Sequence, residues 1–100
     1  MEFYKIWVDD IRYPPNTDWI WVKSVNQAKT LIEILDNTDS EMLISLDHDA
    51  GDYGPPDYIK ILDWLEETGR NYPIHIHSMN VVGVANMRAI IERNNWEEIR

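Results

Sequence analysis

A chain of 100 residues with 44% hydrophobic residues, four glycines, five prolines and no cysteine has the composition of a folded globular protein. The lack of cysteine excludes disulfide frameworks, thiolate zinc sites, iron–sulfur clusters and cysteine nucleophiles. The net charge of −9, which no basic cluster interrupts, argues against binding to duplex DNA through its phosphates.

The apolar runs are too short for a membrane helix, and the first ten residues, MEFYKIWVDD, lack the pattern of a signal peptide. No repeat, linker or charge block divides the chain. We therefore expect a single domain over residues 1–100, located in the cytoplasm and not bound to a membrane.

Two strands and a helix are predicted in the first part of the chain. Residues 3–8 (FYKIWV) and 19–22 (WIWV) are apolar, aromatic and β-branched, as is typical of strands. A helix begins after Ser24, which with Gln27 has the spacing of a capping box, and ends near Asn37. Its apolar stripe consists of Val25, Ala28, Ile32 and Leu35.

The second part repeats the alternation of strand and helix. Residues 42–46 (MLISL) predict a strand, which the run DHDAGDYGPP ends. A helix follows the two prolines up to Gly69, with the apolar residues Tyr58, Ile61, Leu62 and Leu65. Residues 73–77 (PIHIH) predict the next strand, and Asn80 caps a last helix with Val84, Met87 and Ile91 on one face. Residues 96–100 form either a frayed tail or a short edge strand.

Strands that alternate with helices predict a mostly parallel α/β sheet covered on both faces. Only residues 9–18 join the first two strands, and their prolines exclude a crossover helix. At about 3.3 Å per residue, this segment can still return along a strand of about 20 Å. We predict a small doubly wound sheet of the receiver or flavodoxin type, with strand order 2-1-3-4 and without its first helix.

Polar residues follow three strands of this sheet, near the switch point where open parallel sheets bind ligands. They are Asp9, Asp10 and Arg12 after the first strand, Asp47, His48 and Asp49 after the third, and His77, Ser78 and Asn80 after the fourth. Carboxylate oxygens are the ligands that Mg²⁺ or Mn²⁺ takes, together with waters and a substrate phosphate. The pattern indicates a metal-dependent site for a phosphate-bearing ligand.

Structural roles are the alternative for each of these residues. An Asp pair after a strand often begins a loop, and Asp47 and Asp49 could serve a turn that Gly51 and Gly54 permit. Convergence of several ionisable groups on two neighbouring strand ends favours a site. Histidines titrate near neutral pH, so those at strand ends suit proton transfer. By contrast, His75 lies within a strand and is predicted to support the core or the site without binding a ligand.

The acidic pair, the single aspartate and the serine after these strands resemble the phosphoacceptor pocket of response-regulator receiver domains. More specifically, the segments IWVDDIRYPP, ISLDHDAG and PIHIHSMNVVGVANM resemble the cyclic-phosphate-processing receiver-like domain over nearly the whole chain. The chain departs from receivers in two ways, because it has no lysine after a fifth strand and lacks the first helix.

This resemblance implies a role for each candidate. The acids that face the metal would be Asp9, Asp10 and Asp47, and the residue that contacts the phosphate would be Arg12. The rest of the pocket would consist of His48, Asp49, His77, Ser78 and Asn80. It implies processing of cyclic phosphates, including 2′,3′-cyclic phosphate ends in RNA repair. Such a reaction needs the phosphate charge neutralised, a water activated and the leaving ribose oxygen protonated by a histidine. In the alternative, Asp47 accepts the phosphoryl group itself, and the chain is a receiver-like signalling module.

Overall fold

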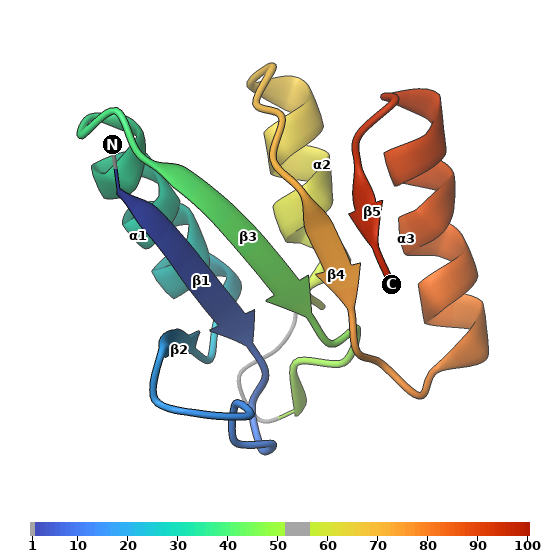
Figure 1. Ribbon diagram of the computed structural model, residues 1–100. Helices are drawn as coiled ribbons and strands as arrows, with labels where there is room; N and C mark the ends of the chain where they lie inside the picture. Colours follow the sequence, from blue (N-terminus) through green and yellow to red (C-terminus); the bar gives the residue numbers. More distant parts are fainter. Residues whose placement is uncertain (1, 52–56) are drawn as a thin grey trace.

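The computed structural model describes residues 2–51 and 57–100 and contains a five-stranded sheet in the order β2-β1-β3-β4-β5 (Figure 1). All neighbouring strands are parallel. The strands are β1 (Phe3–Val8), β2 (Trp19–Val22), β3 (Glu41–Leu46), β4 (Ile74–Ile76) and β5 (Glu98–Ile99). The helices are α1 (Val25–Asp36), α2 (Ile59–Glu67) and α3 (Val81–Arg93). The predicted fold class and strand order are confirmed, and the end of the chain is an edge strand.

The hydrophobic core lies between the sheet and the helices. Successive side chains of a strand point to opposite faces, so alternate residues of the central strands enter this core. Its fully buried members include Ile6, Val8, Ile44 and Leu46 from the strands and Ala28, Ile32, Leu62 and Met87 from the helices. None of the helices in the described ranges is long and apolar enough to cross a membrane.

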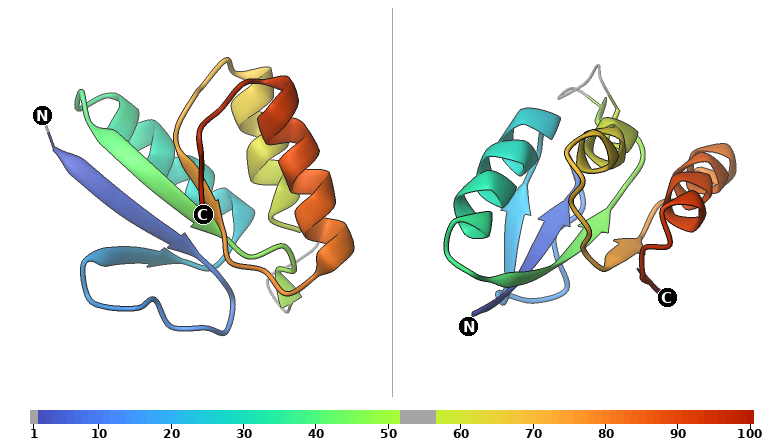
Figure 2. Two further views of the ribbon diagram at one scale, coloured as in Figure 1. Left: turned by 45° about the vertical axis from the view of Figure 1, so that its right-hand side comes forward. Right: turned by 90° about the horizontal axis from the view of Figure 1, so that it is seen from above.

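All three helices lie on the same face of the sheet, so the expectation that helices cover both faces is wrong (Figure 2). Crossovers between parallel strands are right-handed, and those that step across the sheet in one direction lie on one side of it. The helical crossovers all step from β2 toward β5, whereas the connection from β1 to β2 steps the other way. That connection, residues 9–18, contains no helix and lies on the opposite side of the sheet.

We call the sheet face opposite the helices the outer face; it carries Lys5, Trp7, Leu43, Ser45, His75 and His77. Trp7 is buried there although it is not part of the helix-side core, and its Nε1 donates to the carbonyl of Arg12 at 2.9 Å. The loop of residues 9–18 therefore replaces part of the missing helix as a cover.

Side-chain caps begin two helices at the predicted residues. Ser24 Oγ accepts from the backbone N–H of Gln27 at 3.1 Å, but Gln27 Oε1 accepts from Lys23 N at 2.8 Å, one residue before the cap. Asn80 Oδ1 accepts from Gly83 N at 2.9 Å at the start of α3. The turn predicted at Gly54 lies outside the described residues.

Replacing the cap of α1 tests this assignment. We expect Ser24→Ala to lower the free energy of unfolding by about 1 kcal/mol, because the backbone N–H of Gln27 loses its acceptor. Urea denaturation measures the change, with Thr30→Ala on the exposed side of α1 as the control. Equal stability of the two variants would contradict the assignment.

Candidate functional site

The carboxyl ends of β1 and β3 form a pocket of about 300 Å³, which we call the acidic pocket. In the parallel register Val8 pairs with Leu46, and Asp47 N donates to Val8 O at 3.0 Å, so both strand ends are level. The pocket is lined by Asp9, Asp10, Ile11, Arg12, Asp47, Asp49 and Gly51. Five predicted site residues are thus brought together. A larger hollow of about 460 Å³ lies beside α1, and none of the described residues that line it is acidic.

Asp9 is the buried acid of the pocket, with its side chain 1% exposed. Its Oδ1 accepts from the backbone N–H groups of Ile11 at 2.9 Å and Arg12 at 3.0 Å, and its Oδ2 lies 2.9 Å from Nε2 of His77. Burial alone would raise the pKa of Asp9, but these hydrogen bonds together hold it below its ordinary value. Asp9 is therefore a carboxylate in one fixed orientation.

Asp10 has the opposite electrostatic environment. Its pKa is raised by burial and by the negative charges of Asp9 and Asp47. One carboxylate oxygen from each of these three residues lies within 4.8 Å of the others. Three hard oxygens at this spacing fit Mg²⁺ or Mn²⁺, which would relieve their repulsion.

Arg12 is the one cation among the described residues that line the acidic pocket. Its backbone N–H binds Asp9, its carbonyl accepts from Trp7, and its guanidinium Nη1 donates to the carbonyl of His77 at 3.0 Å. The guanidinium is exposed, so its remaining donors are available to an anion at the mouth of the pocket.

His77 has both ring nitrogens bound within the protein. Its Nε2 meets Asp9, and its Nδ1 lies 2.8 Å from Ser45 Oγ. The ring stacks on Trp7 at 3.7 Å and is 8% exposed. Burial lowers the pKa of His77 more than the charges of Asp9 and Asp47 raise it. The geometry does not support the expectation that His77 itself donates a proton to a substrate.

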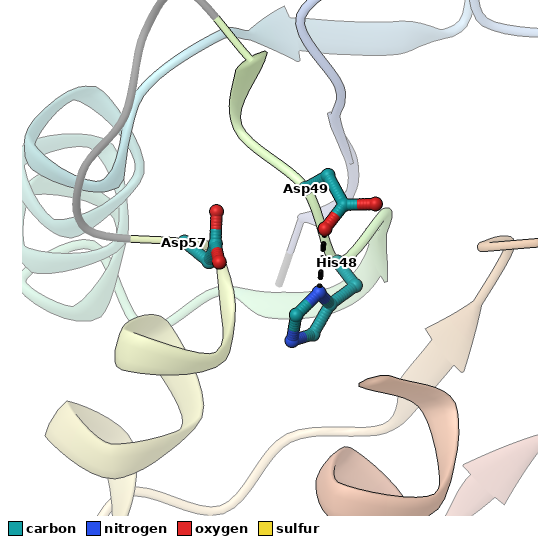
Figure 3. Close-up of side chains that lie close together, drawn as sticks. All are labelled: His48, Asp49 and Asp57. Carbon is teal, nitrogen blue, oxygen red and sulfur yellow. Dashed lines mark hydrogen bonds and ion pairs between the residues drawn. The ribbon is translucent and has the colours of Figure 1, made fainter. Parts of the chain in front are cut away.

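His48 belongs to a second cluster beside the acidic pocket (Figure 3). Its Nδ1 lies 2.9 Å from Oδ1 of Asp49, and the amide of Asn80 donates to the same carboxylate at 3.3 Å. Asp57 lies close enough that His48, Asp49 and Asp57 each offer a ligand atom within 4.8 Å of the others. Because Asp49 also lines the acidic pocket, it joins the two clusters.

The ring of His48 also packs directly on the backbone of Gly83. A β-carbon at position 83 would lie 2.6 Å from Cδ2 of this ring, which is closer than two carbon atoms can approach. The first turn of α3 thus sets the position of His48, and a glycine is required there to admit the ring.

Ser78 lies at the carboxyl end of β4, as predicted, but does not line the acidic pocket. Its Oγ accepts from the backbone N–H of Asn80 at 3.1 Å, and it lines a separate hollow with residues of α3. Asn80 in turn caps α3. Both residues have structural roles in the turn from β4 to α3, and Asn80 additionally holds Asp49.

Sequence reasoning missed Ser45 and Trp7, which hold His77. A signal was present, because Ser45 is the one polar residue in the apolar run MLISL. A serine at such a position is buried and needs a hydrogen-bond partner on its own face of the sheet.

Comparison with known families identifies the chain. The model of the cyclic-phosphate processing receiver domain family matches residues 4–93, a range that includes every predicted site residue. No curated protein and no solved structure matches the chain. The chain therefore belongs to the cyclic-phosphate processing receiver domains, and the predicted resemblance is confirmed.

The contact between Gly83 and His48 yields a prediction with a definite sign. By helix propensity alone, Gly83→Ala would stabilise the protein by about 1 kcal/mol. We expect destabilisation instead, because the new methyl group displaces the His48 ring, and we expect His48→Ala to restore the gain from Gly83→Ala. Urea denaturation of the double-mutant cycle measures this coupling. Additive changes would contradict the contact.

The raised pKa of Asp10 yields a second prediction, about the metal-free protein. A carboxyl group whose pKa is higher in the folded than in the unfolded protein binds its proton more tightly in the folded state. The free energy of unfolding therefore falls as pH rises through that raised pKa. We expect Asp10→Asn to raise the urea midpoint at pH 7, with the difference from wild type shrinking toward acid pH. The control is Asp18→Asn, outside the pocket. A lower midpoint for Asp10→Asn would show that its charge is not repelled.

Proposed function

We propose that the chain is a metal-dependent phosphoesterase that hydrolyses cyclic phosphates, and that its substrates in the cytoplasm are 2′,3′-cyclic phosphate ends of RNA. The observation that carries this proposal is the acidic pocket, where three carboxylates and the exposed guanidinium of Arg12 meet. A cyclic phosphodiester is a small anion, and this pocket combines a cation with acids that fit a divalent ion. A phosphate-bearing small molecule would satisfy the same chemistry.

Asp9, Asp10 and Asp47 are the residues that would hold Mg²⁺ or Mn²⁺. The ion would supply positive charge beside the phosphate and lower the pKa of a water molecule. Asp9 is suited to this role because its carboxylate is already ionised and fixed by three hydrogen bonds. The repulsion felt by Asp10 supports a cation at this place.

The protein's own groups would complete the reaction. Arg12 would bind a non-bridging oxygen of the phosphate. A water oxygen would form a bond to phosphorus and give its proton to a carboxylate of the pocket, while the bond from phosphorus to one ribose oxygen breaks and that ribose oxygen receives a proton. We assign the proton donation to His48, because Asp49 orients its Nδ1 and no described residue binds its Nε2.

A second candidate function is a phosphoaccepting signalling module. It is favoured by Asp47, whose Oδ1 accepts from the backbone N–H of His48 at 2.8 Å and which lines the pocket at the end of β3. In this alternative a carboxylate oxygen of Asp47 attacks the phosphorus of a phosphoryl donor such as acetyl phosphate. Asp47 becomes a phospho-aspartate while the bond from phosphorus to the donor oxygen breaks and the donor leaves as a carboxylate. A cyclic substrate and a proton donor would then have no role.

Addition of divalent ions tests the metal site. We expect Mg²⁺ or Mn²⁺ to raise the melting temperature, because binding to the folded state at a hundredfold excess over Kd contributes about 2.7 kcal/mol. Asp47→Asn should lose most of this gain, whereas Asp18→Asn should keep it. A melting temperature indifferent to millimolar ions in wild type and Asp47→Asn alike would show that the acids are structural.

Hydrolysis of cyclic substrates tests the activity. We expect turnover of oligonucleotides with 2′,3′-cyclic phosphate ends in the presence of Mg²⁺, and a loss of about 10²- to 10⁴-fold in His48→Ala with retained metal-induced stabilisation. The panel should include 2′,3′-cyclic and 3′,5′-cyclic mononucleotides and linear 3′-phosphates. Inert cyclic substrates, together with labelling of Asp47 by acetyl phosphate that Asp47→Asn abolishes, would favour the signalling module.

A further inference from the structure

A chain of hydrogen bonds leads from the outer face of the sheet to the acidic pocket. It runs from His75 Nδ1 to Ser45 Oγ at 2.7 Å, from Ser45 Oγ to His77 Nδ1 at 2.8 Å, and from His77 Nε2 to Asp9 Oδ2 at 2.9 Å. Ser45 is fully buried, while His75 is partly exposed. These hydrogen bonds join β3 and β4 to the end of β1.

The chemistry of these groups permits one arrangement of protons when both rings are neutral. A carboxylate only accepts, so the N–H of His77 must be on Nε2. Its bare Nδ1 then accepts the hydroxyl proton of Ser45. The oxygen of Ser45 in turn accepts an N–H from Nδ1 of His75, which leaves Nε2 of His75 unprotonated. Every donor in the chain therefore points toward Asp9.

The distance of 2.9 Å between Nε2 of His77 and Oδ2 of Asp9 is that of a hydrogen bond, so a proton lies between these atoms, in agreement with this arrangement. Packing alone does not select it. The His77 ring stacks on Trp7 with an angle of 4° between the two ring planes, but this stacking is the same for both tautomers of His77. With the N–H on Nδ1, the lone pair of Nε2 would face the oxygen of Asp9 and repel it.

We infer that Ser45 and His75 are positioning residues for the acidic pocket. Asp9 requires the Nε2–H tautomer of His77, and Ser45, held by His75, donates to Nδ1 of this tautomer and so keeps the ring directed at the carboxylate of Asp9. This inference rests on the proposed function only for what Asp9 binds. Partners that orient a ligating group in this way typically contribute 10- to 100-fold to metal affinity.

The row of Ser45, His77 and Asp9 is similar in composition to a Ser-His-Asp triad, but its geometry excludes that role. A nucleophilic serine must reach the substrate, and Ser45 is fully buried within a central strand. Its hydroxyl also lies between two imidazoles, with its proton engaged by one of them. Ser45 therefore acts through His77.

Two-bond ¹H–¹⁵N correlation spectra of the metal-free wild-type chain test the tautomers directly. At about pH 8, above the ordinary histidine pKa of about 6.5, we expect His77 protonated on Nε2 only and His75 on Nδ1 only. A His77 ring with its proton on Nδ1, or averaged between both nitrogens, would overturn the inference. This readout needs neither metal nor substrate, so it stands or falls separately from the phosphoesterase activity.

Variants then test positioning, with Mn²⁺ alone as the probe. We expect Ser45→Ala and His75→Ala to weaken Mn²⁺ binding by about 10- to 100-fold, because the His77 ring is no longer held in place at Nδ1. His75→Asn, whose side-chain amide can donate to Ser45 in place of Nδ1–H, should restore the Mn²⁺ affinity. Leu43→Ala, on the same strand and face, is the matched packing control.

Retention of the wild-type Mn²⁺ affinity in both alanine variants would refute the positioning role. Should Ser45→Ala fail to fold, the comparison of His75→Ala with His75→Asn decides the question. The wild-type protein could show the expected tautomers and yet neither bind Mn²⁺ nor hydrolyse cyclic phosphates. That result would refute the proposed function but not the fixed arrangement of His77 and Asp9.

Discussion

The rest of the site depends on the need to satisfy one buried carboxylate. Asp9 is shielded from water, so the protein itself must supply its hydrogen-bond donors. Two come from the backbone of residues 11 and 12, which bends the chain after β1 and brings the guanidinium of Arg12 to the pocket. The third comes from His77, which ties the end of β4 to the end of β1. The ionised state of Asp9 in turn contributes to the repulsion that Asp10 experiences.

The fold was predictable to a large extent because its signals are local. Apolar periodicity located the strands and helices, and the short connection of residues 9–18 led to the strand order. The one-sided cover was not foreseen, although the handedness of crossovers implies it once the first helix is missing. Residues 96–100 are too few to show a periodicity, so the sequence alone does not choose between a frayed tail and an edge strand. Pairing of β5 with β4 decides the structure of residues 98–99.

The sequence predicted which strand ends form the site, but not which side chains contact one another there. The acids were identified because parallel strands bring their carboxyl ends to one edge, and the backbone fixes that edge. The partners of side chains were not predictable, since they depend on rotamers and register. His77 binds Ser45 and Asp9. His48 binds Asp49 and packs on Gly83. Ser78 binds the backbone of the turn between β4 and α3. The sequence predicts proton transfer by both histidines, and the proposed function assigns it to His48 alone.

The placement of helices on a single face separates two tasks within each central strand. Ile44 and Leu46 of β3 face the helices and stabilise the fold, while Ser45 between them faces the opposite way and supports the acidic edge. Stability and function often trade off in proteins, because a functional site keeps residues that are not the best choice for the fold. Here the sheet backbone stands between them, so selection could adjust the residues of the outer face while the hydrophobic core stays intact. Such a domain is a favourable scaffold for divergence into new specificities.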